Sequence, residues 1–319
     1  MATTTSEEKA KSVFIEARDL YIGYVVPEVS VETFKSPLAF YRDYVALNRP
    51  VIVKGGAAAW PCLHKWDNEY LVSKLKNQEI SVAYTPNGRA DAVTNIEGKR
   101  WFCEPETRKA TMDQFIEQLA RARAREAGEI PYVQLQNNSL KSEFSALEED
   151  VGHISWSKCL GEAEAVNVWI GSELSSTSFH LDHYENLYVV VSGEKHFTLL
   201  PPHEGKSRLH EEDFPSARFK LNSNTGEYGI EADGNTIHWS ALDLEKPDKQ
   251  QFPRFFDDSL PAPIKCTVKR GDILYLPALW YHWVGQSCDS QGRCIAVNFW
   301  HDFAHGPSFL AKSLAEIIL

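Results

Sequence analysis

The spacing of hydrophobic and polar positions changes character near residue 131 of this chain. In the first part, apolar residues recur with the period of amphipathic helices, apart from one β-branched run that indicates a strand. The helices expected there are Glu7–Tyr21, Pro37–Val45, Leu71–Lys76 and Thr111–Arg125, and the strand is Val51–Lys54. From about Pro131 onward, short runs rich in aromatic and β-branched residues predict strands instead.

The later runs are separated by Gly and Pro turns, which is typical of a mainly β sandwich or jelly roll. The clearest of them are Phe179–Val191, Lys195–Leu200, Ile273–Leu276, Leu279–Val284 and Cys294–Trp300. Between them, residues 222–249 are rich in Gly, Asn, Asp and Glu and are expected to form an exposed loop. The sequence therefore predicts a mainly β fold with helical flanks.

We expect three parts along the chain. Residues 1–130 form an N-terminal segment of helices and strand that packs on the core, residues 131–306 form the β core with its insertion at about 222–249, and residues 307–319 form a C-terminal helix. Leucines and isoleucines of that helix fall on one face. This face is expected either to dock onto its own domain or to form a homodimer contact.

Composition narrows the class of protein. The 33 lysine and arginine residues are outnumbered by 44 aspartate and glutamate residues, so the net charge is −11. This balance argues against nucleic-acid binding through a broad basic surface; it suits a basic peptide substrate, although it also serves solubility. No apolar run is long enough to span a membrane, and the first nine residues show no secretory signal.

The six cysteines are dispersed without CxxC pairs, which is typical of reduced thiols in an intracellular protein. Cys288 and Cys294, on either side of Gly292, leave a disulfide across a hairpin as the alternative. We therefore expect a cytoplasmic or nuclear protein with no direct nucleic-acid or membrane partner.

His180, Asp182 and His282 carry the most informative chemistry. His180 and Asp182 are two residues apart, so on a strand their side chains leave the same face and can bind one ion. His282 lies far downstream, as expected of a ligand from a distant strand of a rolled-up sheet. Two imidazoles and one carboxylate on one face of an octahedral metal leave three positions open, which suits ferrous iron that binds a co-substrate and dioxygen together.

Other residues near these strands are expected to play lesser parts. Asp182, Tyr184, Asn186 and Tyr188 share one face of the expected strand, so all four would face the pocket if no bulge intervenes. Trp300 is expected either to wall the pocket or to belong to the core. The remaining histidines of this region lack ligand spacing and are expected to pack or hydrogen-bond: His183, His196, His301 and His305.

These motifs resemble the Jumonji-C family of iron and 2-oxoglutarate oxygenases over most of the chain. The resemblance lies in Phe40–Lys54 followed by Trp60-Pro61, in His180–Pro202 and in Gly271–Trp300. It implies a double-stranded β-helix of the cupin-like jelly-roll type, Fe(II) as cofactor, and 2-oxoglutarate and O2 as co-substrates. It also implies a protein lysyl hydroxylase that acts at C-3 of lysines in developmentally regulated GTP-binding proteins.

The resemblance assigns the co-substrate pocket as well. It implies that Lys195 anchors the far carboxylate of 2-oxoglutarate, with Thr177 and Tyr132 as neutral donors. Lys195 heads the strand after a turn, so its ammonium can return toward the metal; the alternative is an exposed edge-strand lysine. The other pocket residues implied are Asn186, Asn298 and Tyr188.

Several functions remain open from the sequence. An N-methyl-lysine demethylase would use the same metal site, and a peptidase of methylated histone tails would lack the HExxH helix expected of a zinc protease. A non-catalytic scaffold is the structural alternative. A cupin isomerase or a zinc hydrolase would have no need of Lys195, Thr177 and Tyr132 together.

Overall fold

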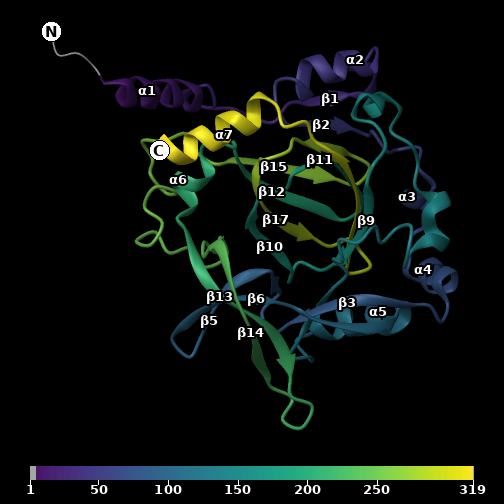
Figure 1. Ribbon diagram of the computed structural model, residues 1–319. Coiled ribbons are helices and arrows are strands. Elements are labelled where there is room, and N and C mark those ends of the chain that lie inside the picture. The colour runs from purple at the N-terminus through teal and green to yellow at the C-terminus, as the bar shows by residue number, and fades with distance from the viewer. Residues whose placement is uncertain (1–4, 319) are drawn as a thin grey trace.

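Two facing β-sheets form the centre of the protein (Figure 1). The structure is a computed structural model that describes residues 5–318. Residues 1–4, which belong to the N-terminal segment expected to lack a secretory signal, and Leu319, the end of the expected C-terminal helix, lie outside this range.

The larger central sheet has six strands in the order β1-β2-β16-β11-β18-β9. Its strands are β1 (Glu28–Ser30), β2 (Val51–Lys54), β9 (Ala165–Gly171), β11 (Tyr184–Ser192), β16 (Ile273–Leu276) and β18 (Cys294–Asp302). The opposing sheet has five strands in the order β15-β12-β17-β10-β4. Its strands are β4 (Arg89–Ala90), β10 (Ser176–His180), β12 (Glu194–Leu200), β15 (Ile264–Lys269) and β17 (Tyr281–Ser287).

The core is built by the two-residue alternation of the strands. In β11, Leu187 and Val189 face an outer hydrophobic cluster, whereas Tyr188 and Val190 face the space between the sheets. Phe197 of β12 meets this inner face from the opposite sheet. Because β11 is buried on both faces, its sequence is an almost continuous apolar run rather than an alternating one.

Two smaller sheets lie beside this core. A four-stranded sheet has the order β14-β13-β6-β5 and a three-stranded sheet the order β7-β3-β8. Their strands are β3 (Glu79–Thr85), β5 (Ala92–Ile96), β6 (Lys99–Glu104), β7 (Glu106–Thr111), β8 (Ile130–Tyr132), β13 (Glu211–Leu221) and β14 (Tyr228–Ser240). Figure 1 shows the long β13–β14 hairpin projecting away from the central sheets.

Helices flank the sheets. They are α1 (Ser6–Asp19), α2 (Pro37–Phe40), α3 (Pro61–Lys65), α4 (Asn68–Leu75), α5 (Met112–Arg123), α6 (Gly205–Leu209) and α7 (Pro307–Ile318). Short 3-10 turns cover Val31–Thr33, Ser145–Asp150 and Ser155–Leu160, and a π-helical turn covers Tyr41–Val45. Among residues 5–318, no helix has the length and apolar character needed to cross a bilayer.

The mainly β fold with helical flanks is confirmed, and three local expectations are wrong. Strands begin well before residue 131, because β3 to β7 occupy Glu79–Thr111. Residues 222–249 are not a loop throughout, since β14 pairs with β13 along most of its length. The expected strand Phe179–Val191 is interrupted at residues 181–183, and its two parts, β10 and β11, belong to different sheets.

The C-terminal helix α7 lies beside α1 (Figure 1). Ala315 is buried, and Lys206 Nζ donates a hydrogen bond to the backbone oxygen of Glu316 at 2.9 Å. The helix therefore contacts its own domain. Leu310, Leu314 and Ile317 remain exposed, and the homodimer contact expected of this face stays a prediction.

Gly88 holds the turn that leads into β4 and so supports β10. Its φ is +75°, and its backbone oxygen accepts a hydrogen bond from Ser176 N at 3.0 Å. A Cβ added at Gly88 would lie 1.8 Å from the backbone oxygen of Leu174. Only glycine meets both requirements at this position.

We expect Gly88→Ala to lower the free energy of unfolding by more than the about 1–3 kcal/mol of left-handed strain, because the backbone clash adds to it. Gly98→Ala is the matched control, since Gly98 also has a positive φ of +83° but a Cβ there meets nothing within 4 Å. Urea unfolding of both variants measures the difference. Equal losses of stability would contradict the role given to the Leu174 contact.

Candidate functional site

The pairing of β10 with β17 brings two histidines side by side. The strands are antiparallel, and His180 lies directly opposite His282 in the register. Their ring centroids are 4.2 Å apart. Because β10 lies between β17 and β4, and β17 between β12 and β10, both imidazoles stand on strands that are paired on either side.

Asp182 completes the group from just beyond the end of β10. Its backbone oxygen accepts a hydrogen bond from Leu279 N at 2.9 Å, which fixes the chain where it leaves the sheet. The carboxylate oxygens lie 3.8 Å from His180 Nε2 and 3.7 Å from His282 Nε2. One donor atom from each of the three residues lies within 4.8 Å of the others, close enough to share a metal ion.

The hydrogen bonds of the two imidazoles determine where their protons are. His180 Nδ1 lies 2.8 Å from the backbone oxygen of Ser178, and His282 Nδ1 lies 2.9 Å from that of Trp280. A carbonyl oxygen only accepts, so both Nδ1 atoms carry the proton and both Nε2 atoms present a lone pair. Backbone carbonyls hold metal-binding histidines in this way.

Burial and neighbouring charges keep the imidazole of His282 neutral at neutral pH. The pKa of His282 is lowered to about 4, chiefly by burial and also by the neighbouring His180, while Asp182 opposes the shift. His282 is therefore neutral and able to donate its lone pair. The Nε2 atoms of the two imidazoles and the carboxylate of Asp182 face one another. This donor set fits a divalent metal ion, which would relieve the repulsion between the lone pairs.

A small chamber adjoins the three donors, between the two central sheets. Its volume is about 30 Å³. Five residues that the sequence assigned to the co-substrate pocket line it together with His180, Asp182 and His282: Tyr132, Thr177, Asn186, Tyr188 and Asn298. The structure therefore brings these side chains together at one place.

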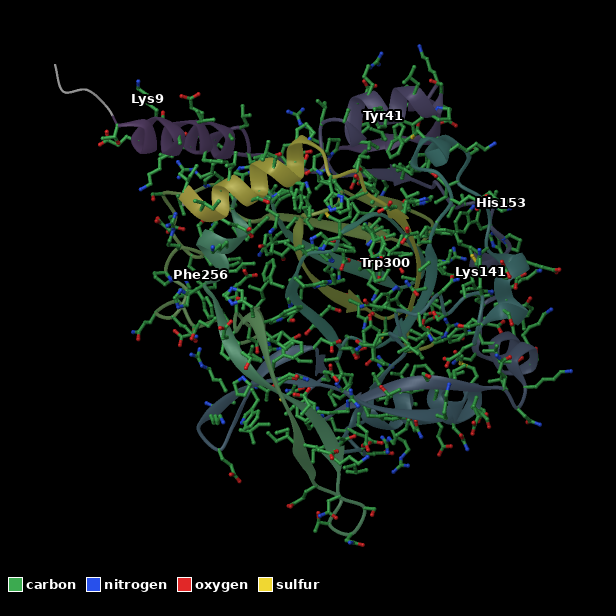
Figure 2. The ribbon with its side chains drawn as sticks, in the orientation of Figure 1. Lys9, Tyr41, Lys141, His153, Phe256 and Trp300 are labelled. Atoms are coloured by element: carbon green, nitrogen blue, oxygen red, sulfur yellow. The ribbon has the colours of Figure 1, made fainter. Side chains whose placement is uncertain are left out.

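The amides in this chamber are held by a hydrogen-bond network. Trp169 Nε1 donates to Asn298 Oδ1 at 2.8 Å, and Asn298 Nδ2 donates to Asn186 Oδ1 at 3.3 Å. Trp300 lies at the centre of the molecule (Figure 2) and lines the chamber, so it serves as a wall. Tyr184 instead stacks on Trp300 with a centroid distance of 4.9 Å and is absent from the lining. Tyr184 was expected to face the pocket only if the strand was uninterrupted; it shares the face of β11 with Asn186 and Tyr188 but covers Trp300 and does not line the chamber.

Lys195 is a buried cation without an anionic partner. Only 1% of its surface is exposed, and its strand, β12, lies between β15 and β17, so the alternative of an exposed edge-strand lysine is wrong. Its Nζ donates to Tyr132 Oη at 3.0 Å. Within residues 5–318, no carboxylate lies within ion-pair distance of it. Burying an unpaired charge is costly, so this position fits an anionic ligand.

A second cavity, of about 460 Å³, opens beside the metal site. It shares Gln136, Thr177, His180 and Asp182 with the inner chamber. Residues that the sequence reasoning missed make up much of its wall: Asp91, Phe102, Glu104, Gln134, Arg218 and Trp239. For Trp239, one sequence signal was available: apolar and polar residues alternate up to this position, which is typical of a strand, in the segment that was interpreted as a loop.

The other histidines take no part in the donor group. His183 is exposed, with its ring 5.7 Å from that of Phe303. His196 hydrogen-bonds through its two ring nitrogens to Thr267 and Ser287. His301 and His305 are likewise outside the group of possible ligands among residues 5–318. The six cysteines are all free, so the alternative disulfide between Cys288 and Cys294 is not formed.

Comparison with known proteins agrees with this geometry. Residues 37–305 match the family described as a cupin-like domain. The chain is similar to "Lysine-specific demethylase JMJ32" of Arabidopsis thaliana, with 38% identity over 92% of this chain and 87% of the relative. It is similar to "Bifunctional peptidase and (3S)-lysyl hydroxylase JMJD7" of Homo sapiens, with 40% identity over 91% and 88%. "JmjC domain-containing protein E" of Dictyostelium discoideum is 33% identical over 92% and 89%.

We expect Asp182→Ala to weaken binding of manganese(II), a redox-stable substitute for ferrous iron, by more than about a hundredfold, because losing a direct ligand costs more than losing a supporting residue. His180→Ala and His282→Ala should behave alike. His183→Ala, one residue from Asp182 but outside the donor group, is the control and should bind as the wild type does. Calorimetric titration of the folded variants measures this, and wild-type affinity in Asp182→Ala would contradict the assignment.

Proposed function

The chain belongs to the cupin-like Jumonji-C oxygenase family, and from that premise we propose that it is an Fe(II)- and 2-oxoglutarate-dependent protein hydroxylase that acts on lysine side chains. One observation carries the proposal: three converging donors lie beside a chamber lined by Tyr132, whose hydroxyl accepts a hydrogen bond from a lysine that is buried without an anion. A plain metal hydrolase would need the donors but not the buried cation.

His180, Asp182 and His282 would hold the iron. With 2-oxoglutarate and O2, iron at this position supplies the oxidation of an unactivated C–H bond. The protein holds the imidazoles in the required tautomer through the carbonyls of Ser178 and Trp280. Strands paired on both sides fix the two histidines, and the hydrogen bond from Leu279 N fixes the backbone at Asp182, so little reorganisation would accompany metal binding.

Lys195 would bind the far carboxylate of 2-oxoglutarate, with Tyr132 and Thr177 as hydroxyl donors. Tyr132 already contacts the ammonium, so the two groups can share one anion. Tyr188 packs against Phe197 at a centroid distance of 5.3 Å and closes the apolar side of the chamber. The chamber is small, with a volume of about 30 Å³. Exclusion of water from the chamber would protect the oxidising chemistry.

Lysine is proposed as the substrate side chain because the human relative is named a lysyl hydroxylase. We propose C-3 as the position and developmentally regulated GTP-binding proteins as the substrates, as the resemblance in the sequence implies. The name of the Arabidopsis relative favours demethylation as the second candidate. We further propose a cytoplasmic or nuclear location, which the six free cysteines support.

We expect Lys195→Met to weaken 2-oxoglutarate binding by about tenfold to a hundredfold, the value of a charge-assisted contact, while manganese(II) binding stays unchanged. The substitution removes an uncompensated buried charge, so the ligand-free protein should lose no stability. Calorimetry and thermal unfolding with and without 2-oxoglutarate measure both effects. Lys265→Met, an exposed position on the neighbouring strand, is the control. Unchanged 2-oxoglutarate affinity in Lys195→Met would remove Lys195 from the site.

The reaction itself is tested by mass spectrometry. A developmentally regulated GTP-binding protein and a methylated histone peptide are each incubated with the enzyme, ferrous iron and ascorbate, with and without 2-oxoglutarate, in air and under nitrogen. We expect one added oxygen atom on a lysine of the GTP-binding protein, only with both co-substrates. The Asp182→Ala variant should give no product.

Other outcomes would change the assignment in specific ways. Loss of a methyl group with release of formaldehyde would make the protein a demethylase. Chain cleavage that proceeds without 2-oxoglutarate would make it a peptidase. A wild-type protein that binds metal and 2-oxoglutarate but gives no product with either substrate would contradict the proposed substrates.

A further inference from the structure

The outer cavity of about 460 Å³ shares His180 and Asp182 with the metal site, and we take it as the substrate entrance. Asp91 and Glu104 are carboxylates on its wall, and Arg218 is its cation. None of these three residues takes part in the proposed binding of iron or of 2-oxoglutarate.

Asp91 is placed next to the metal-bearing strand by the backbone. It follows β4, which runs parallel to β10 with Ala90 opposite Thr177. Ser178 Oγ donates to the backbone oxygen of Asp91 at 2.7 Å, and Ser178 precedes His180 by two residues. The position of this carboxylate is thus tied to the position of the metal donors.

The carboxylate of Asp91 has no cation of its own. It accepts a hydrogen bond from Gln134 Nε2 at 3.1 Å, and within residues 5–318 no basic side chain forms an ion pair with it. The pKa of Asp91 is raised to about 6, chiefly by burial and also by the negative charge of Glu104. A buried carboxylate without a cationic partner is stabilised when a cation enters the cavity.

Glu104 is already paired within the protein. Arg218 Nε donates to its Oε2 at 3.2 Å, and Arg218 Nη2 donates to the same oxygen. Two carboxylates and one guanidinium leave this wall with one uncompensated negative charge. The cavity is therefore complementary to one further positive charge.

An aromatic surface accompanies the charge. Phe102 of β6 and Trp239 of β14 line the same cavity, with ring centroids 5.0 Å apart. Trp239 Nε1 donates to Ser178 Oγ at 3.0 Å, so the indole is fixed to the strand that carries His180. Its ring lies parallel to that of His180 at 6.3 Å. A row of methylenes can lie along such a surface while its charged end reaches a carboxylate.

We propose that Asp91, with Glu104 beside it, binds the cationic end of a long basic side chain of the protein substrate, and that the stem of that side chain lies against Trp239 and Phe102. The inference deepens the proposed function and rests on it only in taking this cavity as the substrate entrance. Asp91 is the specificity-determining residue. An unmethylated ammonium or a guanidinium can donate hydrogen bonds to it, whereas a trimethylated ammonium cannot.

Binding of small probes to the metal-loaded full chain tests this without turnover. The probes are the N-acetyl methylamides of lysine, arginine, norleucine and trimethyl-lysine, and ligand-observed NMR titration gives their affinities. We expect the wild type to prefer lysine over norleucine by about tenfold or more, the value of a charge-assisted contact. Asp91→Asn should remove most of this preference, and asparagine tolerates the left-handed φ of +53° at this position.

Two further variants separate recognition from general effects. Asp258→Asn makes the same charge change at an exposed residue outside the cavity and should keep the wild-type preference. Arg218→Gln frees Glu104 from its internal partner and should strengthen lysine binding severalfold. A variant with a damaged fold would bind lysine more weakly. A higher lysine affinity in Arg218→Gln therefore supports the proposal even if Asp91→Asn does not fold.

The inference is overturned if the wild type binds lysine no better than norleucine, prefers trimethyl-lysine to lysine, or keeps its preference in Asp91→Asn. Weaker lysine binding in Arg218→Gln would overturn it as well. Oxygen addition to a lysine without this binding pattern would contradict the inference and leave the proposed function standing. The expected binding pattern without oxygen addition would contradict the proposed function and leave the inference standing.

Discussion

Three lone pairs that converge without a proton among them are the constraint on which this site depends. The carbonyls of Ser178 and Trp280 hold the imidazole protons on the far nitrogens, so His180, Asp182 and His282 meet through electron pairs alone. Such an arrangement is unfavourable unless a cation is bound. It persists in the fold because the register of β10 and β17 sets it, and that register is maintained by β4 and β12 on either side.

The charges around the metal are ordered from the inside outward. The buried Lys195 donates a hydrogen bond to Tyr132 on the wall of the inner chamber, and the outer cavity carries the carboxylates of Asp91 and Glu104. In the function proposed above, the anionic co-substrate would be attracted to the inside and the basic side chain to the entrance. Because the two ligands would be attracted to opposite ends, neither would compete for the position of the other.

The metal donors could be predicted from the sequence because their chemistry resides in residue type and close spacing, as in His180 and Asp182. The role of Lys195 stays a prediction that the resemblance implies; the structure shows this lysine buried and hydrogen-bonded to Tyr132. The break at residues 181–183 could not, because an apolar run looks the same whether it continues in one sheet or crosses to another. Asp91 and Trp239 were missed for a related reason: only tertiary pairing brings β4 and the β13–β14 hairpin to β10.

The metal-binding histidines and much of the entrance lie on different sheets. This separation explains how similar chains can be named for different reactions. The two donor histidines stand on strands in the interior of a central sheet, whereas the entrance is built partly from β6 and β14 of a smaller sheet whose hairpin is largely exposed. Hydroxylation of a lysine chain carbon and demethylation of its nitrogen need the same iron and differ in which atom is held near it. Relatives of 38% and 40% identity, named for these two reactions, are thus expected to differ where the cationic end of the substrate is bound, which is the wall that Asp91 and Glu104 form here.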